Sequence, residues 1–309
     1  MRAIGIHEFG GPEVLQPLDL PDPVVGPDVV LIRARAAGVN PVDFKIRKGG
    51  LESRYPCGFP LVPGWDVAGV VEAVGPAVPE FSEGDEVMAY VRRDHIQWGT
   101  YAELVPATVR TVAGKPPSLS WAEAAALPLA GLTAWQVLTR VLDVGKDDVV
   151  LVHAAAGGVG SFAVQLAKVL GARVIGTASA ANHDHLRELG AEPLSYGDGL
   201  VERLRSVAPD GVTAVLDLVG GDALEVSPQL LADGGRLASV IDPARVQELG
   251  GAYWFVRPDA NDLATLFRLV DESRLRIHVE RTFPFEEAAE AHRLLEAGHM
   301  RGKLALDIS

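Results

Sequence analysis

The chain has little cysteine, few cations relative to its anions, and no long apolar run. Its 309 residues include one cysteine, Cys57, which excludes an internal disulfide and any metal site made of several cysteines. We interpret Cys57 as an incidental loop residue. The 28 Lys and Arg against 41 Asp and Glu give a net charge of −13. This argues against nucleic acid as the main partner, because phosphate binding needs clustered cations, but it allows a local pocket for one small anion.

The longest apolar runs have the length of strands, well short of the roughly 20 residues that a membrane helix needs. The first residues lack the basic stretch and apolar run of a signal peptide. We therefore expect a cytoplasmic protein without a membrane partner. Because 48% of the residues are hydrophobic, the chain can fill sizeable cores. At roughly 150 residues per domain, its length predicts two domains.

The pattern of the chain changes near residue 120. Before it, short apolar runs at 29–34, 67–74 and 86–91 are bounded by Gly, Pro and Asp, which predicts a mostly β region. Ser120 is a candidate N-cap with Glu123 at the capping-box position. From there to about residue 262, strands and helices alternate, which predicts an α/β fold with a parallel sheet covered on both faces. The tail from residue 263 could belong to either domain.

The most informative segment runs from a predicted strand at 148–153 to a predicted helix at 161–171. Between them, residues 155–160 fit the G-x-G-x-x-G pattern with Ala155 at the first glycine. Gly157 allows close approach of a pyrophosphate, and Gly160 allows the helix to pack on the strand. The helix N-terminus offers free N–H groups to phosphates. The segment predicts dinucleotide binding; the alternative is a glycine-rich turn in an unrelated α/β domain. No Gly-Lys-Ser/Thr follows, so it is not a Walker A loop.

The segment after the second predicted strand indicates which dinucleotide binds. A carboxylate about 20 residues past the glycines would bind the ribose hydroxyls of NAD. Residues 174–183 contain no acid, and the hydroxyls of Thr177 and Ser179 would tolerate a 2′-phosphate. NADPH is therefore favoured over NADH, with His183 adding partial positive charge or simply lying on an exposed helix face. The same window has no Lys or Arg.

Several motifs follow one another in an order that resembles a known family. They are GVNPVD at 38–43, PGWDVAG at 63–69, GTYAE at 99–103, LP at 127–128, the glycine turn, and GK at 302–303. Together they resemble the medium-chain dehydrogenase/reductase superfamily, in its zinc-independent quinone oxidoreductase and alkenal (enone) reductase branch. The resemblance implies a β-rich GroES-like catalytic domain at 1–120, completed by 263–309, and a Rossmann NADP(H)-binding domain at 121–262. It also implies an active site between the domains and a homodimer.

The resemblance also bears on metal binding. In zinc-dependent relatives, a cysteine stands at the position of Asn40 and Gly-His-Glu stands at 64–66. Asn40 and Trp65 supply no thiolate or imidazole, so we predict that no catalytic zinc binds. Reduction of a quinone or of an activated C=C needs less electrophilic help than alcohol oxidation. Hydride adds to the electron-poor carbon, and hydrogen bonds can stabilise the charge that develops on the carbonyl oxygen.

The resemblance assigns roles to individual residues. As catalytic candidates it gives Asn40 beside the nicotinamide ribose, Lys45 in the cleft and Asp43 as an orienting group. A turn role for Asn40, a surface position for Lys45 and a structural ion pair or cap for Asp43 are the alternatives. Phe44, Trp65, Trp98 and Trp254 are expected to shape the substrate pocket, although core packing is commoner for such residues. Further cofactor contacts are expected at Thr133, Ala156, Gly157, Gly158, Val159, Tyr196, Leu218, Val219, Ile241, Phe255, Val256, Arg257 and Lys303.

The function predicted from these residues is an NADPH-dependent reductase of quinones or α,β-unsaturated carbonyl compounds, both small molecules. Two alternatives stay open. One is a non-catalytic NADPH-binding redox sensor or structural partner. The other is a discrete enoyl-thioester reductase, although the acidic composition offers no obvious basic groove for a carrier-borne substrate.

Overall fold

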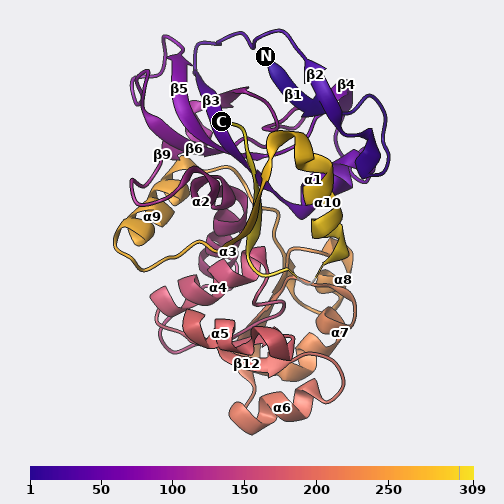
Figure 1. The fold of residues 1–309 in the computed structure, drawn as a ribbon. Helices are drawn as coiled ribbons and strands as arrows, with labels where there is room; N and C mark the ends of the chain where they lie inside the picture. Colours follow the sequence, from indigo (N-terminus) through magenta and orange to yellow (C-terminus); the bar gives the residue numbers. More distant parts are fainter. Residues whose placement is uncertain (299) are drawn as a thin grey trace. The chain divides into compact units, whose positions relative to one another are not determined.

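The computed structural model describes residues 1–298 and 300–309, and these form two compact units. The first, which we call the β unit, comprises Met1–Leu129, Pro258–Ser273 and Ile277–Ser309. The second, the α/β unit, comprises Ala130–Arg257 and Arg274–Arg276. Both units are drawn in Figure 1, in which colour follows the sequence.

The α/β unit contains one six-stranded sheet in which every pair of neighbours is parallel. The strand order is β12-β11-β10-β13-β14-β15. Numbered within the unit, this is the order 3-2-1-4-5-6 of a Rossmann fold, so the predicted α/β class is confirmed. The strands are β10 (Val149–Val152), β11 (Arg173–Ala178), β12 (Glu192–Ser195), β13 (Val212–Asp217), β14 (Leu231–Ser239) and β15 (Ala252–Tyr253).

Helices connect these strands, as parallel neighbours require. Figure 1 shows α4 and α5 on the left of this unit and α7 and α8 on its right. Apolar side chains of β10, β11 and β13 are almost fully buried, which explains their near-continuous runs of Val, Ile and Leu. The helices are α3 (Pro128–Arg140), which begins in the β unit, α4 (Gly158–Val169), η3 (Ala180–Asn182), α5 (His183–Leu189), α6 (Leu200–Val207), α7 (Gly221–Leu230) and α8 (Pro243–Glu248).

The β unit is built on a seven-stranded mixed sheet of order β16-β17-β3-β5-β6-β9, with β8 also paired to β3. Two small sheets, β1-β2 and β4-β7, accompany it. The strands are β1 (Arg2–Gly5), β2 (Gln16–Asp19), β3 (Val29–Val39), β4 (Cys57–Val62), β5 (Asp66–Val74), β6 (Glu86–Tyr90), β7 (Ile96–Trp98), β8 (Leu104–Thr108), β9 (Val112–Gly114), β16 (Val279–Pro284) and β17 (Lys303–Asp307). The helices are η1 (Pro12–Val14), α1 (Pro41–Arg47), η2 (Val109–Thr111), α2 (Trp121–Ala126), α9 (Ala260–Asp271), η4 (Phe285–Glu287) and α10 (Ala288–Ala297).

Most of the C-terminal tail lies in the β unit. Strand β17 runs antiparallel to β3, with Leu304 opposite Val39. This register places Lys303, at the start of β17, beside the end of β3, where the chain turns into α1. Two segments 263 residues apart in the sequence therefore meet at Asn40 and Lys303.

The units divide at other places than the predicted residues 120 and 262. Helix α2 lies in the β unit because its alanines are buried there. A Cβ at Gly38 of β3 would lie 2.3 Å from the carbonyl oxygen of Ala125, so the helix approaches the strand as closely as glycine permits. The capping box at its start is present, since the Glu123 N–H donates to Ser120 Oγ at 3.3 Å and the Ser120 N–H donates to Glu123 Oε2 at 2.9 Å.

The segment Arg274–Arg276 lies in the α/β unit. The side-chain amide of Gln165, on α4, exchanges two hydrogen bonds with the backbone of Arg276, at 2.9 and 3.0 Å. Strand β16 begins after this segment, at Val279. The contact with Gln165 therefore holds these three residues in the α/β unit.

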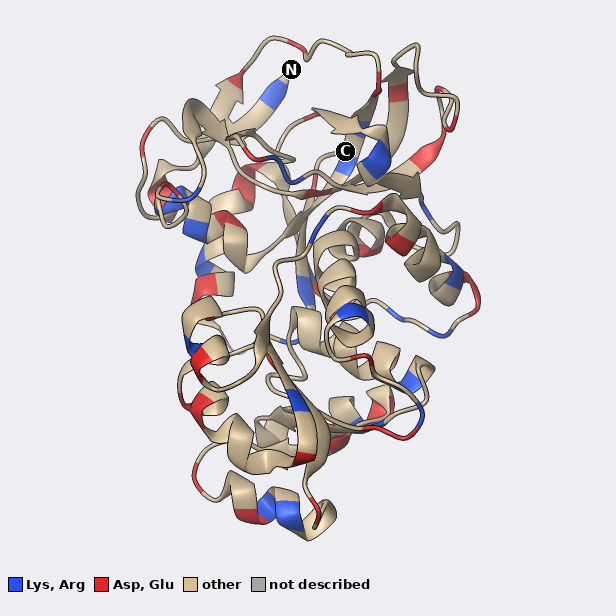
Figure 2. Ribbon diagram, turned by 180° about the vertical axis from the view of Figure 1, so that it is seen from behind, with Lys and Arg blue, Asp and Glu red and all other residues tan. Residues whose placement is uncertain are grey.

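Charged side chains are spread over both units. Figure 2 shows Lys and Arg interspersed with Asp and Glu along helices, strands and loops. Many of them form exposed pairs, such as Arg33 with Glu72 and Arg173 with Glu192. Among the described residues, none of the helices combines the length and apolar character that crossing a membrane would need.

Candidate active site

The glycine turn lies between β10 and α4 of the α/β unit. Gly157 is the N-cap of α4, in an extended conformation, and no side chain caps the helix. A Cβ at Gly160 would lie 2.3 Å from the Ala154 carbonyl oxygen and 2.7 Å from Ala155 Cα, so glycine is required for this close packing. The N–H groups of the first helical turn have no acceptor within the helix, which makes the turn suited to an anion such as a pyrophosphate.

Behind the turn, Thr177 and His153 form a buried hydrogen-bonded group. Thr177 Oγ1 accepts a hydrogen bond from the Ala154 N–H at 3.3 Å and lies 3.3 Å from His153 Nδ1. His153 Nε2 lies 3.2 Å from Ser227 Oγ. Burial lowers the pKa of His153 to about 4, although the charge of Asp217 opposes that shift. The Thr177 hydroxyl therefore braces the turn, and its contact with a 2′-phosphate remains a prediction.

The ends of β13 and β14 are tied together by Asp217, which the sequence analysis did not single out. Its carboxylate accepts hydrogen bonds from the N–H groups of Val219 and Gly220 at 3.0 Å and from Ser239 Oγ at 2.7 Å. Ser239 Oγ in turn accepts from the Ile241 N–H at 3.1 Å. Val219 and Ile241 consequently project at the carboxyl edge of the sheet with 51% and 41% of their surface exposed. Apolar groups at this edge are available to a bound cofactor.

Three further predicted cofactor residues follow β11 and β12. Ser179 Oγ accepts a hydrogen bond from Asn182 Nδ2 at 3.4 Å, and His183 begins α5. Tyr196 is 55% exposed. Arg203 of α6, which the sequence analysis missed, donates to the carbonyl oxygens of Ser195 at 2.9 and 3.1 Å and of Tyr196 at 3.4 Å. Its guanidinium therefore fixes the loop that carries Tyr196.

Gln136 on α3 holds the segment that contains Phe255, Val256 and Arg257. Its Oε1 accepts hydrogen bonds from Trp254 Nε1 at 3.2 Å and from the Arg257 N–H at 3.1 Å, and its Nε2 donates to the Arg257 carbonyl at 3.0 Å. Thr133 lies about one turn earlier on the same helix and is buried. Gln136 is another positioning residue that sequence reasoning missed. Trp254, expected in the substrate pocket, lies in the α/β unit and directs its indole N–H to Gln136.

In the β unit, the side-chain amide of Asn40 is held between two opposite charges. Asn40 Nδ2 donates to Asp66 Oδ2 at 2.9 Å. Asn40 Oδ1 accepts a hydrogen bond from the ammonium of Lys303, which also donates to the Val39 carbonyl at 3.3 Å. Asp66 Oδ1 accepts from the Leu129 N–H at 2.9 Å. If the amide were flipped, its NH2 group would face the Lys303 ammonium and its oxygen would face the Asp66 carboxylate. The network therefore fixes the orientation of the Asn40 amide.

Asp43 occupies the N3 position of α1 and accepts a hydrogen bond from the Asn40 N–H at 2.8 Å and from the Tyr101 hydroxyl at 3.2 Å. Burial raises the pKa of Asp43 to about 7 and that of Asp66 to about 6. Burial also lowers the pKa of Lys303, against the attraction of both carboxylates. The structure thus gives Asp43 the cap position that was the alternative reading, and it places the Lys303 ammonium on Asn40, so a direct cofactor contact of Lys303 remains a prediction.

The buried network continues beyond Tyr101. The Tyr101 hydroxyl lies 3.1 Å from His292 Nε2, and Arg47 Nη1 lies 3.1 Å from His292 Nδ1. Arg47 is fully buried and pairs with Glu296 at 2.5 Å. Burial and the charge of Arg47 lower the pKa of His292 to about 3. This chain of contacts joins α1 to α10 behind Asn40.

Lys45 and Phe44 lie on other faces of α1. Lys45 is exposed, and its ammonium makes no hydrogen bond or ion pair with any described residue. Phe44 is half-buried, with the Lys48 ammonium 5.3 Å from its ring centroid. The structure does not bring Lys45 into the Asn40 network, and its catalytic role remains a prediction.

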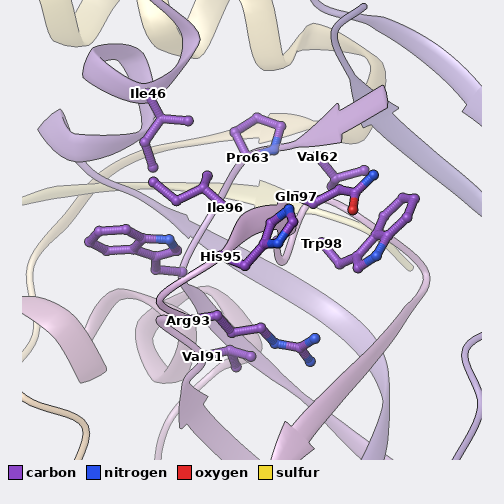
Figure 3. A pocket seen from close by; sticks show the side chains of 11 residues that line it. Ile46, Val62, Pro63, Val91, Arg93, His95, Ile96, Gln97 and Trp98 are labelled. Atoms are coloured by element: carbon purple, nitrogen blue, oxygen red, sulfur yellow. The ribbon is translucent and has the colours of Figure 1, made fainter. Parts of the chain in front are cut away.

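Around Trp65, which precedes Asp66 in the chain, lies a small pocket of about 10 Å³, which we call the Trp65 pocket (Figure 3). Trp65 is almost fully buried and packs edge to face against Tyr90, with ring centroids 6.1 Å apart. Trp98 is 40% exposed. The pocket thus brings together two of the four residues predicted to shape the substrate site. Its lining residues are Ile46, Val62, Pro63, Trp65, Val91, Arg93, His95, Ile96, Gln97, Trp98 and Gly99.

Comparison with known proteins identifies the family. Residues 26–117 match the model of the alcohol dehydrogenase GroES-like domain, and residues 189–306 match that of a zinc-binding dehydrogenase. A chloroplastic NADPH-dependent alkenal/one oxidoreductase from Arabidopsis thaliana is 34% identical over 99% of this chain and 79% of its own length. The chain belongs to the medium-chain dehydrogenase/reductase superfamily. It lies in the branch of the quinone and alkenal/one oxidoreductases, as the sequence motifs predicted.

Solved structures of this superfamily are similar along the whole chain. The quinone oxidoreductase of Coxiella burnetii matches with a TM-score of 0.90 and 39% identity, covering 100% of this chain and 99% of its own. An NAD-dependent alcohol dehydrogenase matches with a TM-score of 0.90 and 36% identity over 100% of both chains. This member of the superfamily is accordingly an oxidoreductase that uses a nicotinamide cofactor.

The name of the second family model raises the question of zinc. Within 1–298 and 300–309, no three or more His, Cys, Asp or Glu side chains come together as a metal site. At Asn40, the amide oxygen is occupied by the Lys303 ammonium, whose charge would repel a divalent cation. The donors present at this position do not fit a catalytic zinc ion. That the protein works without zinc remains a prediction for metal analysis.

Proposed function

We propose that this oxidoreductase transfers hydride from NADPH to quinones or to the C=C of α,β-unsaturated carbonyl compounds, without zinc. The observation that carries the proposal is the Asn40 amide. One of its N–H bonds is used on Asp66, and the other makes no hydrogen bond with the described residues. A fixed, neutral donor suits a carbonyl substrate and a ribose hydroxyl better than it suits a metal.

The cofactor would supply the hydride, and the chain's own residues would bind and orient the cofactor and the substrate. The free N–H groups of the glycine turn would hold the pyrophosphate, and Val219 and Ile241 would pack against the cofactor at the sheet edge. Addition of hydride at the β-carbon moves negative charge to the carbonyl oxygen. The proposed role of the Asn40 network is to donate a hydrogen bond near that charge or to the ribose, while water delivers the proton to the α-carbon.

Preference for NADPH over NADH is part of the same proposal. No carboxylate stands in residues 174–183 to repel a 2′-phosphate, and Ser179, His183 and the exposed Tyr196 lie at the ends of β11 and β12. A homodimer is proposed on the family resemblance alone, and the cytoplasmic location stays the expectation drawn from the sequence. Light scattering of the purified protein would test the dimer.

The deciding experiment follows cofactor oxidation by absorbance with a panel of quinones, enones, alkenals and enoyl thioesters, using NADPH and NADH in parallel. We expect turnover with quinones or enones and a higher kcat/KM with NADPH. Asn40→Ala should lose most activity, while Asn261→Ala, on the exposed face of α9, should retain it. NADPH binding without turnover on any substrate would favour the non-catalytic alternative. A requirement for added zinc would contradict the proposal.

A further inference from the structure

Arg93 is a half-buried cation that lacks a carboxylate partner. Its Nη2 donates to the Pro106 carbonyl oxygen, and no acid among the described residues lies within ion-pair distance of it. The neighbouring Arg92, by contrast, pairs with Asp94 at 3.9 Å. Burial lowers the pKa of Arg93, which means that the surroundings disfavour its charge. A guanidinium has five N–H donors, so most of its hydrogen-bonding capacity is left for a ligand.

Arg93 lines two hollows at once. One is the Trp65 pocket (Figure 3). The other, which we call the Val24 groove, has a volume of about 390 Å³ and is also lined by Val62, Trp98 and Gly99. The two therefore adjoin at the Arg93 and Trp98 side chains. The Val24 groove, at about 390 Å³, lies within the range of about 300–1,000 Å³ that is typical of small-molecule sites, whereas the Trp65 pocket has room for about one water molecule.

The other charges of these hollows leave Arg93 uncompensated. In the Val24 groove, Asp22 is held by the N-terminal ammonium of Met1 at 3.0 Å. In the Trp65 pocket, the ionisable side chain besides Arg93 is that of His95, which is exposed. The remaining walls are mostly apolar, with Met1, Leu20 and Val24 on the groove side and Ile46, Val62 and Ile96 on the pocket side. Burying an unpaired cation in such walls is costly unless an anion joins it.

We infer that the site takes substrates that are apolar at their reactive end and carry a carboxylate, which Arg93 binds. The planar guanidinium matches a carboxylate through two parallel N–H donors, and the indole of Trp98 offers apolar surface beside it. A net charge of −13 repels anions at long range, so a local cation is needed to select one. This inference rests on the proposed enone or quinone reductase activity and names its preferred substrate class.

The test compares two substrates that differ in the charge of one end and in a single methyl group. The first is a straight-chain methyl ketone enone with a carboxylic acid at the far end of its alkyl chain, and the second is its methyl ester. The reacting enone is identical in both, so intrinsic reactivity cancels. We expect the wild-type protein to prefer the acid, with the difference in KM. Arg93→Met should lower kcat/KM for the acid roughly 10- to 100-fold, the range for a hydrogen bond to a charged group, and leave the ester nearly unchanged.

Arg110→Met is the matched control, because it removes the same charge from an exposed position of η2 outside both hollows. Arg93→Lys should restore part of the preference. If Arg93→Met fails to fold, the saturated keto acid and its methyl ester are instead compared as competitive inhibitors of the wild-type protein. We expect the acid to inhibit more strongly than the ester. Equal kcat/KM for acid and ester in the wild type, or equal inhibition, overturns the inference alone. If the protein reduces neither of these substrates nor any other enone or quinone, that result overturns the proposed function instead.

Discussion

The two units present their candidate functional groups by different means. In the α/β unit, the glycine turn offers backbone N–H groups, and a Cβ at Gly160 would collide with the backbone of Ala154 and Ala155. In the β unit, the Asn40 amide is held by charged side chains from distant parts of the chain, Asp66 and Lys303. A backbone site needs small residues in a short stretch, whereas a side-chain site needs compensated charges. The two kinds of site should therefore fail differently when mutated.

The largest effect is expected from removing the cation of the Asn40 network. Lys303→Met leaves Asp66 and Asp43 buried without their positive neighbour, which should cost about 3–5 kcal/mol of stability. Urea unfolding would measure the loss. The double variant Lys303→Met with Asp66→Asn should recover part of it, because the uncompensated charge is then also gone. Additive losses in the double variant would show that Lys303 and Asp66 do not stabilise each other.

A smaller loss of stability is expected in the backbone site, with a sharper effect on cofactor binding. Gly160→Ala places a Cβ 2.3 Å from the Ala154 carbonyl oxygen, and the resulting shift of α4 should cost about 3 kcal/mol. NADPH affinity, followed by cofactor fluorescence, should fall because the turn N–H groups move. Gly145→Ala is the matched control, since nothing lies within 4 Å of a Cβ there. Retention of both stability and affinity in Gly160→Ala would remove the packing argument for this glycine.

These two sites also differ in how far the sequence could predict them. The strand, glycines and helix of the turn are contiguous, so local rules located them and the whole order of alternating strands and helices. Asn40 and Trp65 were recognised as positions of interest, but their partners were not. No local pattern shows that Lys303 contacts Asn40, that Gln136 holds residues 254–257, or that Asp217 ties two loops together. These contacts depend on strand register and on buried polar groups finding partners across the fold.

The same reasoning applies to the place where the β unit ends. The capping box and alanines of α2 correctly predicted a helix after Ser120. Whether that helix packs on the β unit or on the α/β unit depends on Gly38, more than 80 residues earlier, whose missing Cβ makes room for Ala125. Single-sequence patterns carry little information about which distant surface receives a helix.

The pH dependence of stability should show the cost of the buried carboxylates. The pKa of Asp43 is raised from 3.8 to about 7, so the folded state binds the proton more tightly than the unfolded state. The contribution of Asp43 to the free energy of unfolding is therefore present at low pH and is lost as the pH rises through 7. Between pH 5 and 7 this loss should reach roughly 2 kcal/mol. Asp43→Asn should reduce the slope in urea titrations at several pH values. An unchanged slope would mean that Asp43 does not cause it.

The smallest effect tests what Thr177 contributes to the glycine turn. Thr177→Val removes a buried hydroxyl that contacts the Ala154 N–H and His153, and should cost about 1 kcal/mol. If the hydroxyl braces the turn, the affinities for NADPH and NADH should weaken by the same factor, because both cofactors share the pyrophosphate. Ser179→Ala is the matched comparison, and under the proposed 2′-phosphate contact it should weaken NADPH alone. Isothermal titration of both cofactors against both variants measures this. A loss confined to NADPH in Thr177→Val would place its hydroxyl at the 2′-phosphate after all and weaken the contrast between a braced backbone site and a charged side-chain site.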